Sequence, residues 1–168
     1  MATYTLIQEV TIGSGGAANI EFTSIPATYT DLVILISCRG SGSGVVVDSK
    51  IQFNNSTSNY AGRNIEGNGT TIYSQTHGST GIKLIDAGSG ATSNIFTSAE
   101  VYIPNYRGNQ FKSISMANVT ENFGSSSWAQ YLAGSWSDTS AITSIKLTPD
   151  AGTYLQHSSA YLYGISNT

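Results

Sequence analysis

The chain has 168 residues, a formal net charge of −3 and only 10% charged residues, against roughly 25% in an ordinary soluble domain. Its seven lysines and arginines are scattered singly, which excludes the clustered cations that nucleic-acid binding needs, and no apolar run approaches the roughly 18 residues that span a membrane. The low net charge argues against disorder and the shortage of charged helix formers argues against helices, so the composition predicts one all-β domain covering residues 1–168.

The first predicted strands lie in the segment that ends at Arg39. Tyr4–Val10 is predicted to be an edge strand, and Ala18–Phe22 is predicted to be its short partner. Ser24–Arg39 then contains Leu32–Ile36, the longest unbroken aliphatic run of the chain. Because β-branched residues dominate this run and its length suits a strand, we predict that it forms the central strand of the fold, buried on both faces.

The middle of the chain predicts shorter strands separated by polar loops. Val45–Val47 and Lys50–Phe53 have the composition of strands. Tyr60–Glu66 and Thr71–Gln75 flank Gly67-Asn-Gly69, a turn sequence that favours a β-hairpin. The segment Thr76–Asn94 is ambiguous, since only Gly81–Ile85 is apolar within it.

The C-terminal half contains the clearest alternation of apolar and polar residues. Five further strands are predicted there: Phe96–Ile103, Phe111–Val119, Trp128–Trp136, Ile142–Leu147 and Ser158–Ile165. About ten strands with long polar loops and no helical periodicity predict a two-sheet antiparallel β-sandwich of jelly-roll type.

Residues that could carry catalytic or metal chemistry are few. His77 and His157 have no partner at zinc-ligand spacing and are predicted to lie in surface loops. No Gly-x-Ser-x-Gly elbow and no calcium-loop pattern occurs, and the single Cys38 is predicted to be a buried apolar residue. The sequence therefore predicts a protein that is not an enzyme and uses no metal or cofactor.

The most suggestive group of residues is aromatic. Trp128, Tyr131 and Trp136 lie within one predicted strand, and Tyr106 is followed by Arg107. Such rings can stack on sugars while Arg bonds hydroxyls, but Trp, Tyr and Arg are also enriched in cores and subunit interfaces. Trp128 and Trp136 are an even number of residues apart and are predicted to share one strand face, which favours core or interface.

Two stretches together resemble a known class of proteins. They are Ile25-Pro-Ala-Thr-Tyr-Thr-Asp-Leu-Val-Ile with Arg39 beyond it, and Ile142-Thr-Ser-Ile-Lys-Leu leading through Gly152 to Ser159-Ala-Tyr-Leu-Tyr-Gly-Ile165. The pattern resembles virion structural proteins of tailed bacteriophages, especially those of marine and cyanobacterial hosts. These motifs mark strands, and the resemblance transfers no catalytic residue.

The resemblance implies a location and a set of partners. It implies a non-enzymatic protein on the surface of the virus particle, in contact with the major capsid protein or with tail proteins. Capsid decoration is the first expectation; a tail-fibre or carbohydrate-binding module that recognises a host surface polysaccharide is the alternative. Symmetric self-association is also expected, with a homotrimer as one arrangement, because surface virion proteins follow the symmetry of the particle.

Overall fold

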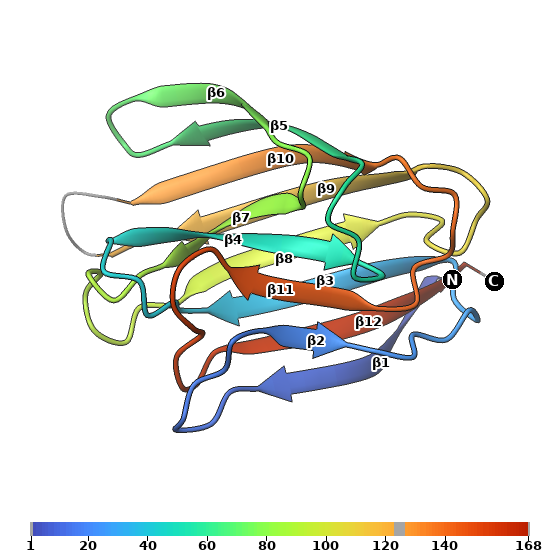
Figure 1. Cartoon of the computed structure of the whole chain (residues 1–168), viewed down its shortest axis with the longest axis horizontal. Helices are drawn as coiled ribbons and strands as arrows, with labels where there is room; N and C mark the ends of the chain where they lie inside the picture. Colours follow the sequence, from blue (N-terminus) through green and yellow to red (C-terminus); the bar gives the residue numbers. More distant parts are fainter. Residues whose placement is uncertain (1, 123–126, 168) are drawn as a thin grey trace.

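A computed structural model describes residues 2–122 and 127–167 of the chain. Twelve antiparallel strands form two sheets, and no helix in the described residues is long and apolar enough to span a membrane. The predicted all-β sandwich is therefore confirmed, with two strands more than expected (Figure 1).

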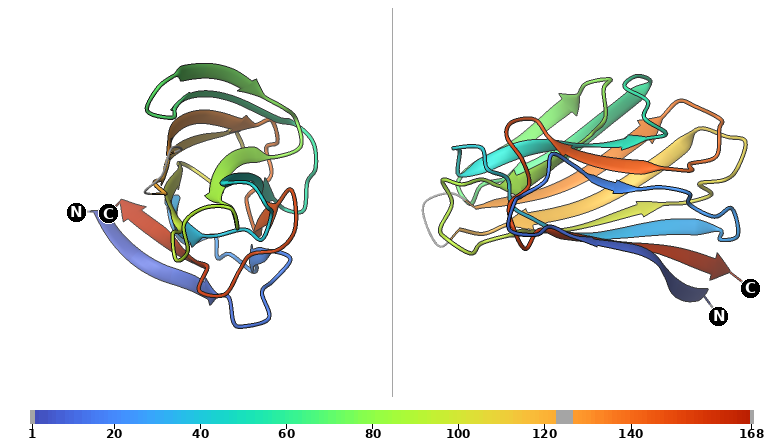
Figure 2. Two further views of the ribbon diagram at one scale, coloured as in Figure 1. Left: turned by 90° about the vertical axis from the view of Figure 1, so that its left-hand side faces the viewer. Right: turned by 60° about the horizontal axis from the view of Figure 1, so that its bottom comes forward.

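The two sheets differ in size. The large sheet has the order β1 (Ala2–Thr11), β12 (Ser159–Asn167), β3 (Asp31–Cys38), β8 (Thr97–Ile103), β9 (Lys112–Thr120), β10 (Trp128–Trp136), β5 (Tyr60–Gly67) and β6 (Ile72–His77). The small sheet has the order β2 (Ile20–Phe22), β11 (Ile145–Pro149), β4 (Val46–Phe53) and β7 (Ile82–Ala87). The β5–β6 end of the large sheet extends beyond the small sheet (Figures 1 and 2).

The path of the chain is that of a jelly roll with two inserted hairpins. Without β5–β6 and β9–β10, the remaining eight strands pair from the outside inwards: β1 with β12, β2 with β11, β3 with β8 and β4 with β7. This is one long antiparallel hairpin whose successive pairs alternate between the two sheets, as in a jelly roll. The two inserted hairpins pair with each other through β10 and β5, and both widen the large sheet.

The predicted central strand is only partly as expected. β3 does lie inside the large sheet, between β12 and β8, and Leu32, Ile34 and Ile36 point into the core. On the outer side the prediction holds for Val33, which is 4% exposed, and is wrong for Leu35, which is 39% exposed because no other part of the described chain packs over it.

The predicted pairing of the first two strands is also wrong. Tyr4–Val10 is an edge strand as expected, but its partner is β12, and Ala18–Phe22 contributes β2 to the small sheet beside β11. The jelly-roll path explains this difference, because the connection after its first strand crosses from one sheet to the other.

Aromatic rings fill the core between the sheets near β5, β10 and β4. The Trp136 ring lies 5.6 Å from that of Phe53 and stacks on Tyr60 with 6.1 Å between centroids. The Tyr60 hydroxyl accepts a hydrogen bond of 2.6 Å from the Phe53 amide, and burial raises its pKa to about 12. Cys38 is buried, as predicted, and burial together with the nearby Asp86 raises the pKa of its thiol.

A buried arginine organises the segment that joins the two sheets after β7. Arg39 is only 7% exposed and donates hydrogen bonds of 2.7 to 3.3 Å to four backbone carbonyl oxygens, those of Ser89, Ala91, Thr92 and Ile95. A guanidinium suits this role because its five N–H donors have a fixed fan-like geometry. Arg39 therefore holds the β7–β8 connection against the end of the sandwich.

Candidate functional site

The two outer surfaces of the sandwich differ in chemistry. We call the exposed side of the large sheet the outer face. Strand alternation and the pairing registers place seven of the eight exposed large apolar side chains in the described residues on it: Tyr4, Leu6, Leu35, Ile65, Ile72, Val119 and Tyr131. An exposed apolar surface that spans a whole sheet is typical of an interaction site.

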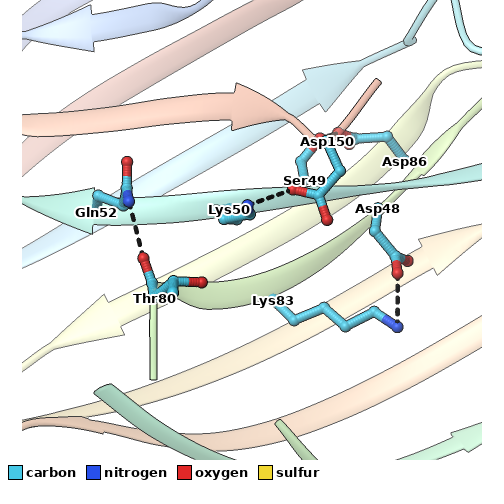
Figure 3. A network of polar contacts seen from close by, with 8 residues as sticks. All are labelled: Asp48, Ser49, Lys50, Gln52, Thr80, Lys83, Asp86 and Asp150. Atoms are coloured by element: carbon cyan, nitrogen blue, oxygen red, sulfur yellow. Dashed lines mark hydrogen bonds and ion pairs between the residues drawn. The ribbon is translucent and has the colours of Figure 1, made fainter. Parts of the chain in front are cut away.

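The exposed side of the small sheet is charged instead. Figure 3 shows Lys50 paired with Asp150 from the segment after β11, and Lys83 of β7 paired with Asp48 of β4, each at 2.9 Å. The Gln52 amide also donates to the Thr80 carbonyl oxygen at 2.8 Å. These groups are partly exposed and already satisfied, so this side of the molecule is a solvated surface.

A groove runs along the middle of the outer face. Its floor is made of small side chains from neighbouring strands, Ser115 and Ala117 on β9 and Ala133 on β10. Tyr131 and Ile65 stand on one side and Glu100 and Tyr102 on the other, enclosing about 710 Å³, which we call the outer groove. The outer groove exists because alternating positions of the central strands carry Ser or Ala where the flanking strands carry large residues.

The outer groove continues towards the β3 side of the sheet. A second depression of about 470 Å³ shares Glu100 and Ala117 with it and is also lined by Leu35 and Tyr161. The apolar surface is therefore continuous across five strands, from β5 to β3, with β12 beside it.

Two charged side chains flank the outer groove without forming an ion pair in the part of the chain that the structure describes. Arg63 donates one hydrogen bond of 3.1 Å to the carbonyl oxygen of its neighbour Gly62. The carboxylate of Glu100, on the opposite wall, makes neither a hydrogen bond nor an ion pair within residues 2–122 and 127–167. Both groups are thus available to a partner of opposite charge.

The ring of Tyr102 has a fixed position on the wall. Its hydroxyl donates to Asp31 Oδ2 at 3.0 Å, and the other oxygen of Asp31 accepts the Asn105 amide at 2.8 Å. Partial burial and the adjacent Asp31 carboxylate raise the pKa of Tyr102. The hydroxyl therefore stays neutral, and its hydrogen bond fixes the ring on the same wall as Glu100.

Two of the five residues singled out in the sequence belong to the core. Trp136 is 2% exposed in the aromatic cluster, as the core interpretation predicted, so its alternative assignment as a glycan or interface contact is wrong. Tyr106 is fully buried and its hydroxyl donates to the Pro26 carbonyl oxygen, so its assignment as a glycan or interface contact is wrong. The Tyr106 ring packs in the core against the loop that precedes β3.

The other three residues lie at the surface but not together. Tyr131 is 71% exposed on the wall of the outer groove, and exposed Arg107 donates to the Ala27 carbonyl oxygen at 2.8 Å. Trp128 shares the inward side of β10 with Trp136, as predicted, but lies half-buried beyond the small sheet and stacks on Tyr73 of β6 at 5.8 Å. Sequence reasoning missed Arg63, because nothing in the sequence shows that β5 pairs with β10.

The histidines occupy two different environments. His77 was predicted to lie in a surface loop, but it ends β6; burial and nearby Lys83 lower its pKa, and its buried Nε2 has no hydrogen-bond partner among the described residues. His157 lies in an exposed turn with a left-handed φ of 72°. Within residues 2–122 and 127–167, no group of three His, Cys, Asp or Glu side chains lies close enough to hold a metal ion.

A carboxyl group is fully buried between the sheets. Burial raises the pKa of Asp86 on β7 to about 7; the Ser49 hydroxyl, which donates to its Oδ2, lowers the pKa, and the nearby Asp48 carboxylate raises it. Figure 3 shows Asp86 beside Ser49, behind the charged side of the small sheet. Asp86 lies away from the outer groove, and its hydrogen bond with Ser49 joins β7 to β4 inside the core, so we assign it a structural role.

Comparison with known proteins finds no matching family model, no matching curated sequence and no matching solved structure. The two outer surfaces of the sandwich and their side chains are therefore the features that bear on function.

Proposed function

We propose that this chain is a non-enzymatic structural protein of a bacteriophage virion, located on the particle surface as a capsid decoration protein. The observation that supports this role best is the difference between the two sides of the sandwich. One side is a broad apolar sheet suited to contact with protein, and the other is a solvated surface of paired charges. A jelly roll with one exposed apolar face is suited to be a subunit of a larger assembly.

The resemblance of Ile25–Ile34 and Ile142–Ile165 to virion proteins supports the same assignment. Its partners would be the major capsid protein or a tail protein, and the location of the protein would decide between them. We expect mass spectrometry of purified particles to detect the chain in a fixed ratio to the capsid protein, and particle imaging to place density of this size on the head. Absence from purified particles would contradict the proposal, and density on the tail would assign the chain to a fibre.

A second candidate function, glycan binding, is favoured by the Trp128–Tyr73 pair. The two rings stack at 5.8 Å where the large sheet extends past the small sheet, and exposed Gln75 lies one position further along the same side of β6. A flat aromatic surface beside an amide is chemically suited to a sugar ring and its hydroxyls. A host surface polysaccharide would be the ligand.

Replacing Trp128 with alanine tests this second function. We expect binding to purified host polysaccharide, measured by calorimetry, to weaken about tenfold, because a ring contact of this kind contributes about 1 kcal/mol or more. Trp128→Phe should retain most of the binding, and Phe111→Ala, which removes an exposed ring elsewhere, should leave it unchanged. Equal binding by the wild-type chain and Trp128→Ala, with both folded, would exclude this site.

A further inference from the structure

We propose that the outer face is the contact surface for a second copy of this chain, related to the first by a two-fold axis. The inference deepens the proposed virion role, because it names one partner and the surface that it uses. Four features of the molecule support this contact: the size of the face, its relief, the positions of Arg63 and Glu100, and the chemistry of the opposite side.

The part of the outer face that a two-fold contact can cover approaches the area that a stable dimer needs. The six strands β3, β8, β9, β10, β5 and β6 lie at about 4.8 Å spacing, with about six paired residues each at about 3.4 Å, and make a flat surface of about 600 Å² before the relief of the side chains is counted. A standard protein interface buries about 800 Å² on each partner. Tyr, Leu, Ile and Val are the large side chains of this face and Ala and Ser the small ones. Its tyrosines and its few charges are typical of an interface centre.

The pairing registers give the face a self-complementary relief. Ile65, Tyr131, Ala117 and Glu100 form one row across β5, β10, β9 and β8. We place the two-fold axis parallel to the strands, between the two facing sheets and midway between β9 and β10. Rotation about this axis lays β10 of each copy over β9 of the other. Tyr131, 71% exposed, would then face Ala117 of the second copy, so that a large side chain fills the outer groove opposite.

The charges follow the same symmetry. The next row holds Arg63, Ala133, Ser115 and Tyr102, so the same axis lays Arg63 over Tyr102 of the second copy, one row from its Glu100. An arginine can stack on a tyrosine ring and pair with a carboxylate beside it. On the six overlaid strands each copy supplies one exposed cation, Arg63, and one exposed anion, Glu100, which lies opposite Ile65 and one row from Arg63 of the second copy, so two such pairs form. Glu9 is on the outer side of β1 and stays outside the contact.

The opposite side of the molecule explains why the assembly closes at two. A two-fold contact uses the same patch on both copies, whereas rings and fibres need two different complementary patches on each copy. The exposed side of the small sheet carries paired, solvated charges, and none of the large exposed apolar side chains of the described residues lies on it. The two-fold contact overlays β3, β8, β9, β10, β5 and β6, so β12 and β1 stay outside it. A trimer, the arrangement expected from the resemblance, would instead need two different patches on each copy.

Sedimentation of the full chain tests the contact. We expect a species of twice 17.7 kDa for the wild-type chain. Ala117→Arg places a charge on the groove floor opposite Tyr131 and should weaken dimerisation about 100-fold or more, since loss of an interface centre has effects of this size. Ala117 is exposed, so the variant should keep its fold; Tyr131→Ala, which only shortens an exposed ring, should weaken the dimer too. Thr148→Arg adds the same charge on the exposed side of the small sheet and should leave the dimer intact.

A charge exchange tests the pairing directly. Arg63→Glu and Glu100→Arg should each weaken the dimer, and the double variant R63E/E100R should restore it, because each new cation again meets a new anion. A monomeric wild-type chain, a dimer insensitive to Ala117→Arg, or absence of rescue in the double variant would overturn the inference. So would a monomer in which Ala117→Arg abolishes binding to capsid protein or polysaccharide, since the face would then have another occupant. Detection of the chain in particles does not depend on these results, so the virion proposal and the dimer can fail separately.

Discussion

Arg39→Met is expected to lower the free energy of unfolding by about 3 kcal/mol, because buried hydrogen bonds to a charged group contribute about 1.5–3 kcal/mol each and the loop can recover only part of them from water. The four carbonyl oxygens of the β7–β8 connection would lose their shared donor, while methionine keeps the aliphatic volume. Urea unfolding followed by tryptophan fluorescence measures the loss. Limited proteolysis should also cut residues 88–96 faster in the variant.

Arg107→Met is the matched control for this prediction. Arg107 is exposed and donates one hydrogen bond, to the Ala27 carbonyl oxygen, so its replacement should change stability much less. Equal stability of Arg39→Met and Arg107→Met would contradict the structural role assigned to the buried guanidinium.

Asp86→Asn is expected to stabilise the protein at pH 8 and to change it little at pH 4. The pKa of Asp86 is about 7 when folded and about 3.8 when unfolded, so the folded state binds the extra proton between these values. The stability of the wild-type chain therefore falls as pH rises from about 4 to about 7, by up to about 4 kcal/mol at 1.36 kcal/mol per pH unit, and is level above pH 7. Asparagine cannot ionise and still accepts the Ser49 hydrogen bond, so the variant should lack this slope.

Thermal unfolding from pH 4 to pH 8 measures the effect of Asp86. Asp150→Asn serves as control, because that carboxylate lies on the exposed side of the small sheet and its loss should leave the slope in place. Tyr154 and Cys38 are two other titratable groups near Asp86; burial raises their pKa values, so they stay protonated over this range. The nearby Asp48 is present in both chains, so the difference between the two curves reports Asp86. Parallel curves for the wild-type chain and Asp86→Asn would contradict the predicted ionisation.

The sequence was sufficient for the class of fold and for most strands. Alternation of apolar and polar residues located β8, β9, β10 and β12 closely, because each of these strands has one core side and one exposed side. The continuous run Leu32–Ile36 was misleading because it does not alternate, although the strand that it forms has one core side and one exposed position on the other side. An apolar residue normally indicates burial, and Leu35 faces outwards on a sheet that no other part of the described chain covers.

The outer groove could not be predicted, because it depends on which strands become neighbours. Arg63 and Glu100 are 37 residues apart in the sequence (100 − 63) and belong to strands joined only through β10 and β9. The aromatic residues that drew attention in the sequence are divided among the core, the groove wall and the β6 edge. Residue type indicated a contact for each ring, and only the pairing registers showed which contact it was.

The jelly-roll pairing has a consequence for how the molecule folds. Strands β4 and β7 are the closest partners along the roll, whereas Ala2 must find Asn167 across almost the entire chain. Folding slows as contacts connect more distant residues, and domains of this kind fold in milliseconds to seconds. The hairpin β9–β10 can form early, β5–β6 can join only at β10, and β1 is added last, because β12 is its sole sheet partner. The outer groove lies on strands that meet before the roll closes, so its apolar side chains are assembled and exposed while folding is still incomplete.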